Sequence, residues 1–191
     1  MLKTNNILTF TLCILAILQA PIFYYYTSGP VGMLLISIYI LMALIMTITL
    51  VKALKIVRST FQLVGLIFSI LLGSASLFFG ERFIEKFDWR FYKNERQEIV
   101  DRVLKGEYKE NIVHLDYFLP ISNGGNDIII DDYGSGYTIL FFIDRGILDH
   151  YSAFVYTNNY DKIQEFESKI NNDNAEGTNY KLAPNWYRIS N

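Results

Sequence analysis

The two histidines of the chain each lie within two positions of an acidic residue, and these four residues are its best candidate for metal chemistry. His114 and Asp116 are two positions apart in an expected strand, so their side chains point to the same face. His150 follows Asp149 at the start of another expected strand. If these strands pair, the four side chains meet, and two imidazoles with two carboxylates can bind a divalent metal ion. Their spacing matches no recognised ligand motif, and the alternative is a surface role for His114 and a turn role for His150.

Motifs for other chemistries are incomplete or missing in the sequence. Cys13, the only cysteine, lies within an apolar run far from either histidine, which argues against a reactive thiol. Gly134 and Gly136 lack the third glycine and the following helix of a dinucleotide-binding motif, and Gly-x-Ser-x-Gly does not occur. We therefore expect no catalytic residue and no cofactor, and a metal-dependent enzyme is the weakest of the functional hypotheses.

The elements that position these residues fall into two parts of different composition. Residues 1–80 contain no Asp or Glu and only four basic residues, Lys3, Lys52, Lys55 and Arg58. The other 13 basic and all 19 acidic residues follow residue 80, which gives residues 81–191 a net charge of −6. This division indicates hydrocarbon as the solvent of the first part and water as the solvent of the second. The acidic charge gives no reason to expect a nucleic-acid partner.

Three apolar runs without charged side chains fill the first part, at residues 7–26, 31–50 and 62–80. Each is close to the ~20 residues that a helix needs to cross a bilayer. Three helices that are apolar on every face would need far more surrounding protein than this chain supplies, so we expect a transmembrane domain. Pro21 directly follows Ala20, the best small residue for cleavage, so we expect the first run to be retained and not removed as a signal peptide.

The basic residues between the second and third runs set the expected orientation. Lys52, Lys55 and Arg58 have no acidic neighbour and place this connection in the cytoplasm by the positive-inside rule. The N-terminus then also lies in the cytoplasm, and residues 81–191 lie outside the cell membrane. Three further basic residues after the third run favour the opposite orientation but alternate with acidic ones: Arg82, Lys86 and Arg90.

Small residues recur every four positions in the third run, at Gly65, Ser69 and Gly73. This spacing places them on one helix face, where another helix can approach closely. The face is expected to pack against the first two helices, and the alternative is self-association of the whole protein.

Residues 81–191 have the pattern of a small α+β domain. Helical periodicity continues from residue 81, and Asn94 followed by Gln97 resembles the start of a further helix that ends at Gly106. Strands are expected at 112–119, 127–131, 137–143 and 151–156, then a helix at 161–170 and a last strand near 186–189. Short turns between consecutive strands predict antiparallel hairpins, with the flanking helices over one face of the sheet.

These features favour an integral membrane protein that anchors a small binding domain at the membrane surface. Its partners would be the lipid bilayer and a protein, in an accessory, sensory or immunity-like role, or a second copy through the transmembrane helices. The alternative is a regulatory subunit of a channel or transporter, although ion pathways normally need ionisable groups within the bilayer.

Overall fold

The computed structural model describes residues 2–26, 29–56, 59–145, 151–172 and 177–190. The chain divides into two compact units, Met1–Phe87 and Asp88–Asn191. This division lies within helix α4 (Glu81–Leu104), which is one continuous helix without the predicted new start at Asn94. The domain boundary at residue 80 stays a prediction.

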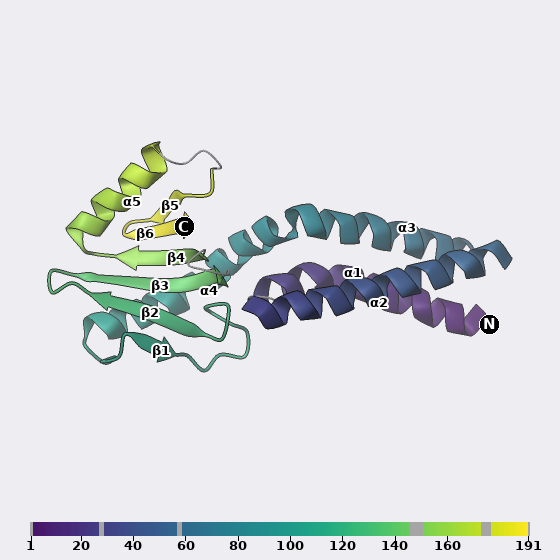
Figure 1. Ribbon diagram of the computed structural model, residues 1–191, viewed down its shortest axis with the longest axis horizontal. Helices are drawn as coiled ribbons and strands as arrows, with labels where there is room; N and C mark the ends of the chain where they lie inside the picture. The colour runs from purple at the N-terminus through teal and green to yellow at the C-terminus, as the bar shows by residue number, and fades with distance from the viewer. Residues whose placement is uncertain (1, 27–28, 57–58, 146–150, 173–176, 191) are drawn as a thin grey trace. The chain divides into compact units, whose positions relative to one another are not determined.

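Three long helices make up most of the first unit (Figure 1). They are α1 (Leu2–Tyr26), α2 (Gly29–Ile56) and α3 (Thr60–Ala75), and α3 continues through the π-helical turn η1 (Ser76–Gly80) into α4. Three helices of the described chain are long and apolar enough to span a membrane, as the three apolar runs predict. Ser59 caps α3, since its hydroxyl accepts from the backbone N–H of Gln62 at 3.5 Å.

Helices α1 and α3 run in the same direction. Early in both helices a Cβ atom added at Gly65 would lie 2.3 Å from Cγ2 of Thr9, and late in both a Cβ added at Gly80 would lie 2.8 Å from Cβ of Ala20. The aromatic C-terminal segment of α1, at residues 24–26, therefore lies at the same end of the unit as η1. A chain that crosses a layer three times must have its first and third helices parallel, and this arrangement satisfies that condition.

The second unit contains a six-stranded antiparallel sheet in the order β1-β2-β3-β4-β6-β5. Its strands are β1 (Ile112–His114), β2 (Asp127–Asp132), β3 (Tyr137–Arg145), β4 (Tyr151–Thr157), β5 (Tyr180–Ala183) and β6 (Trp186–Ser190), and helix α5 (Tyr160–Asn172) follows β4. The predicted series of antiparallel hairpins from β1 to β4 is confirmed.

Two strands differ from the prediction. The first strand ends at His114 and not at residue 119, because the backbone after it turns into a loop with its own hydrogen bonds. Strand β5 was not predicted. It is four residues long, and it pairs with β6 across a tight turn in which Asn185 takes the left-handed conformation (φ 64°).

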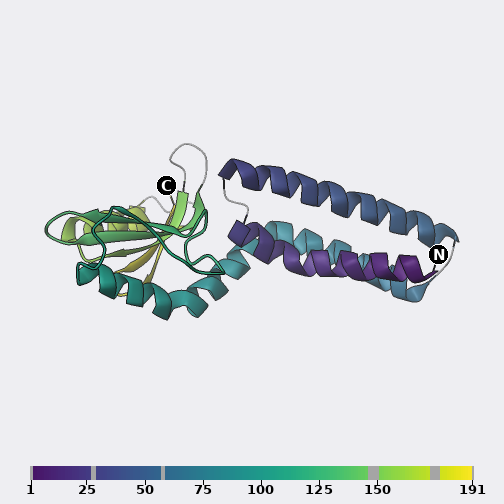
Figure 2. The same ribbon diagram turned by 90° about the horizontal axis from the view of Figure 1, so that it is seen from below.

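The helices of this unit cover opposite faces of the sheet. The ring of Trp89 in α4 lies 5.2 Å from that of Phe154 and 5.1 Å from that of Trp186. The ring of Phe166 in α5 lies 5.5 Å from that of Tyr187, which is the neighbour of Trp186 in β6 and therefore points to the other face. Figure 2 shows α4 running along its face of the sheet.

The prediction that both helices lie over one face is therefore wrong. The physical reason lies in β3 and β4, where six consecutive residues of each strand are buried: 138–143 in β3 and 152–157 in β4. A strand that is buried at successive positions must be covered on both sides. The continuous apolar run Ile139–Ile143 is the sequence signal of this two-sided burial.

Candidate functional site

The structure places the predicted metal ligands in a different arrangement from the expected one. His114 ends β1, and its Nδ1 lies 2.9 Å from Oδ1 of Asp127, the residue opposite it in β2. Asp116 lies beyond the strand, exposed in the following loop, while Asp149 and His150 lie outside the described residues. Within the described ranges, no group of three or more His, Cys, Asp or Glu side chains is placed to hold a metal ion. The four-residue metal cluster stays a prediction.

Asp127 joins His114 to a third charged group. Oδ2 of Asp127 lies 3.5 Å from Nη1 of Arg145, and Nη2 of Arg145 donates to the Asp127 carbonyl oxygen at 3.2 Å. The guanidinium also stacks 4.1 Å from the ring centre of Phe142. A nearby hydroxyl, that of Ser122, donates to the Asp127 carbonyl at 2.5 Å and accepts from the backbone N–H of Phe142 at 2.9 Å. Because this hydroxyl holds backbone groups together, the cluster is a structural junction between β1, β2 and β3.

The loop between β1 and β2, residues 115–126, is the part of this unit that the sequence pattern missed. The side chain of Asn126 forms hydrogen bonds with two other positions of the loop. Its Nδ2 donates to the Tyr117 carbonyl at 2.9 Å, and its Oδ1 accepts from the Ile121 N–H at 2.8 Å. The Asn126 carbonyl also accepts from the Leu115 N–H at 2.9 Å. Asn126 has φ 60°, a left-handed conformation that asparagine tolerates better than most residues. One side chain thus closes the base of the loop.

A buried arginine ties the same loop to α4. Nη2 of Arg96 donates to the Ile121 carbonyl at 2.9 Å and to Oδ2 of Asp88 at 2.5 Å, and Nε also donates to the Ile121 carbonyl at 3.2 Å. Arg96 is 1% exposed and Asp88 is 2% exposed. The guanidinium lies 4.6 Å from the ring centre of Phe154 in the sheet. A charge so far from water needs this set of partners, and they fix the position of the loop relative to α4.

The fixed loop presents apolar side chains to solvent. Phe118 is 94% exposed, and its neighbours Tyr117 and Leu119 are 37% and 38% exposed. Ile112, on the edge strand β1 that precedes the loop, is 59% exposed as well. We call the three consecutive loop residues Tyr117, Phe118 and Leu119 the apolar loop surface. Such residues cost free energy in water, and a loop held in one conformation loses little entropy when it binds, so this surface suits contact with another apolar surface.

In the first unit, the predicted small-residue face contacts α1. The Cβ position at Gly65 is filled by the side chain of Thr9, and the Gly73 carbonyl accepts from Nε2 of Gln19 at 3.1 Å. The hydroxyl of Ser69 lies 3.4 Å from Sγ of Cys13. The structure therefore places all three residues against a helix of the same chain. Self-association through this face stays a prediction.

Comparison with protein-family models, with curated proteins and with solved structures finds no match for this chain. Its function must therefore be inferred from its own residues.

Proposed function

We propose that this chain is an integral membrane protein in which α1, α2 and α3 cross the bilayer and anchor the second unit, which engages a protein partner through the apolar loop surface. The observation that carries the proposal is the exposure of large apolar side chains in two places, along the long helices and at Phe118.

The long helices expose apolar side chains along their whole length. Phe10 in α1, Leu34 in α2 and Leu71 in α3 are 63%, 62% and 66% exposed. Almost none of the apolar stretch of α2 is buried within the protein. Exposed apolar surface costs about 25 cal/mol per Å² in water, and a lipid environment removes this cost. The absence of Asp and Glu from residues 1–80 supports the same conclusion.

The composition of the loop favours a protein over a lipid surface as its partner. Residues 115–126 include one acidic residue, Asp116, and no Lys or Arg. Segments that bind anionic membranes combine apolar residues with basic ones, and this loop lacks the basic ones. An exposed aromatic side chain on a rigid loop is typical of the central contact of a protein interface.

Affinity capture of the full-length protein from chemically crosslinked membranes tests the proposal, with Phe118→Ser as the informative variant. Tyr160→Ser serves as the matched control, because Tyr160 is also an exposed aromatic residue (72%) but lies at the start of α5. A specific partner should be recovered with the wild type and the control. It should bind Phe118→Ser about 30-fold more weakly, since a central interface residue is worth ~2 kcal/mol or more. Equal recovery by all three proteins would contradict the proposed role of the loop.

A further inference from the structure

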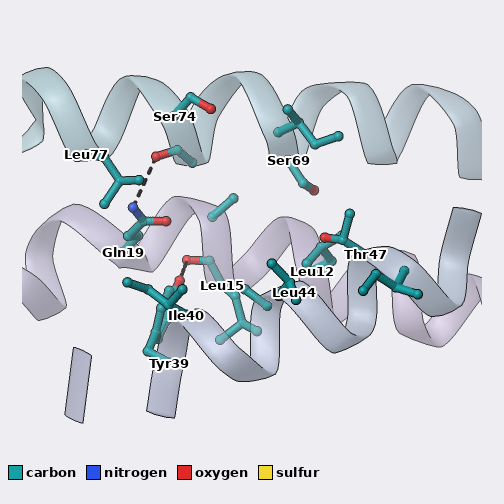
Figure 3. Close-up of a pocket in the computed structure, with 15 residues that line it drawn as sticks. Leu12, Leu15, Gln19, Tyr39, Ile40, Leu44, Thr47, Ser69, Ser74 and Leu77 are labelled. Carbon is teal, nitrogen blue, oxygen red and sulfur yellow. Dashed lines mark hydrogen bonds between the residues drawn. The ribbon is translucent and has the colours of Figure 1, made fainter. Parts of the chain in front are cut away.

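A cavity of about 350 Å³ lies between α1, α2 and the C-terminal half of α3 together with η1 (Figure 3). Its apolar lining includes Leu12 and Ala16 of α1, Ile40 and Leu44 of α2, Ile70 of α3 and Leu77 of η1. On each helix the lining residues recur at intervals of three and four, so each helix turns one face toward the cavity. The cavity is about 12 Å long, because residues 69–77 of α3 and η1 cover eight steps of about 1.5 Å.

Two of the larger polar side chains in the lining are used by the helices themselves. Nε2 of Gln19 donates to the Gly73 carbonyl at 3.1 Å, and the hydroxyl of Tyr39 donates to the Leu15 carbonyl, as the dashed lines in Figure 3 show. These donors connect α1 to α3 and α2 to α1. Because the Gln19 and Tyr39 donors are already bonded to backbone carbonyls, a ligand in the cavity would contact mainly aliphatic side chains.

We propose that this cavity binds one acyl chain of a membrane lipid. The inference rests on the proposed function, since lipid surrounds the cavity only if the three helices cross a bilayer. Most of the lining is apolar, and an apolar cavity that stays unfilled forfeits the dispersion contacts of its walls. Its volume lies within the range of sites for small apolar ligands, about 300–1,000 Å³.

The walls suit a thin, flexible chain better than a helix from a second copy. Close helix packing in membranes needs a continuous face of small residues at the contact. In this lining the small residues alternate with bulky ones such as Ile40, Leu44 and Leu77. The glycines of α3 are already occupied, since Gly65 contacts Thr9 and Gly73 contacts Gln19. An unbranched hydrocarbon chain can follow the irregular surface between such side chains.

Photolabelling of the full-length protein in phosphatidylcholine vesicles, with a diazirine midway along one acyl chain, tests this inference. Labelled residues are mapped by mass spectrometry. The label should be enriched severalfold at Leu44 and Ile70 over Leu41 and Leu71. These two control residues are at least as exposed (59% and 66%, against 54% and 48%) but do not line the cavity.

A pair of variants separates the cavity from the general lipid contact of the helices. Ala43→Phe places a large side chain in the lining and should reduce the labelling of Leu44 and Ile70 severalfold. Leu41→Phe adds the same side chain outside the cavity and should leave that labelling unchanged. The wild-type pattern decides the question even if Ala43→Phe does not fold.

Two results would overturn the inference while leaving the membrane anchor intact: equal labelling of lining and control residues, or no label at Leu44 and Ile70. A carbonate wash before labelling separates these results from failure of the anchor. Protein released by the wash would refute the proposed membrane insertion, and the acyl-chain site with it.

Discussion

Arg96 is only 1% exposed, so its guanidinium group is buried. Its N–H groups donate hydrogen bonds to two segments that are distant in sequence. Asp88 lies eight residues earlier in α4, and Ile121 lies 25 residues later in the loop. Ion pairs of this kind contribute little net stability compared with apolar residues of the same size, but breaking one leaves a buried charge unpaired. The pair therefore acts mainly as a positional constraint on the loop.

Replacing Asp88 with Ala should lower the free energy of unfolding of the second unit by about 3–5 kcal/mol, because the Arg96 charge stays buried without its carboxylate. Urea unfolding of the full-length protein in detergent measures this change. The fluorescence of the two tryptophans is a suitable signal, since Trp89 and Trp186 both belong to the second unit.

Arg102→Met provides the control for this experiment. Nε of Arg102 lies 2.8 Å from Oε2 of Glu107, but both side chains are about half exposed, at 51% and 44%. Solvent screens such a pair, so the unfolding midpoint should stay close to that of the wild type. An equal loss of stability in the two variants would show that burial of the Arg96–Asp88 pair is not what matters.

Asp144 gives the second unit a predictable pH dependence. Asp144 lies at the exposed end of β3, and partial desolvation of its carboxyl raises the pKa, against a smaller opposing effect of the Arg145 backbone N–H. The folded protein therefore favours the protonated form, and stability is lost as pH rises through the folded pKa. Because solvent still reaches the residue, the resulting effect on stability should be small. Asp144→Asn should increase the free energy of unfolding at pH 7, and the gain should vanish at about pH 3, where the aspartate is protonated in both states. A gain of the same size at both pH values would contradict this explanation.

At the scale of elements, the contact between α1 and α3 depends on a missing side chain. A Cβ atom at Gly65 would lie 2.3 Å from Cγ2 of Thr9, a distance that requires one helix to move. Gly65→Ala should therefore destabilise the helix pair by about 1–3 kcal/mol, the usual cost of overpacking. Gly73→Ala should cost less, because its nearest neighbour is the flexible Gln19 side chain at 3.4 Å.

The single cysteine reports on this contact without further engineering. Sγ of Cys13 lies 3.6 Å from the Gly65 carbonyl oxygen, at the interface of α1 and α3. N-ethylmaleimide should modify Cys13 faster in the Gly65→Ala variant than in wild type or Gly73→Ala. Identical rates in the three proteins would mean that the close approach at Gly65 does not hold the helices together.

Elements defined by a continuous local pattern could be predicted from the sequence. The three apolar runs correspond to α1, α2 and the α3–η1 segment, and the expected helix at 161–170 lies within α5. Strands β2, β3 and β4 were predicted to within two residues at each end, because turn residues bound each run. We did not predict from the sequence that α4 and α5 cover opposite faces. A continuous apolar run indicates a strand, but the two-sided burial of β3 and β4 that it also implies was not used to place the helices.

The apolar loop surface could not be predicted from the local sequence pattern, because side chains distant in sequence fix the conformation of the loop. The run Ile112–Leu119 has the composition of a strand, yet Asn126 and Arg96 fix its second half as a loop. Pro120 and the turn at residues 123–126 were the available signals, since proline lacks the N–H that a ladder needs. The exposure of Phe118 follows only once these contacts are known.

At the scale of the whole molecule, the central claim is that the first unit is solvated by lipid and the second by water. The first unit has no acidic residue before position 80, while the second has a buried sheet core with clusters such as Leu140, Val155 and Tyr187. If α1, α2 and α3 each cross the bilayer, the connections at the two ends of α2 must lie on opposite sides of the membrane.

Cysteine accessibility tests this claim most directly. Single cysteines at Ser28, Ser59 and Asn191 are introduced into a Cys13→Ser background and treated with a membrane-impermeant thiol reagent, on intact cells and after lysis. Three crossings with a cytoplasmic N-terminus require that positions 28 and 191 react on intact cells and that position 59 reacts only after lysis. Labelling of position 59 alone on intact cells would reverse the proposed orientation but keep three crossings. Labelling of positions 28 and 59 from the same side would contradict the three-crossing arrangement itself.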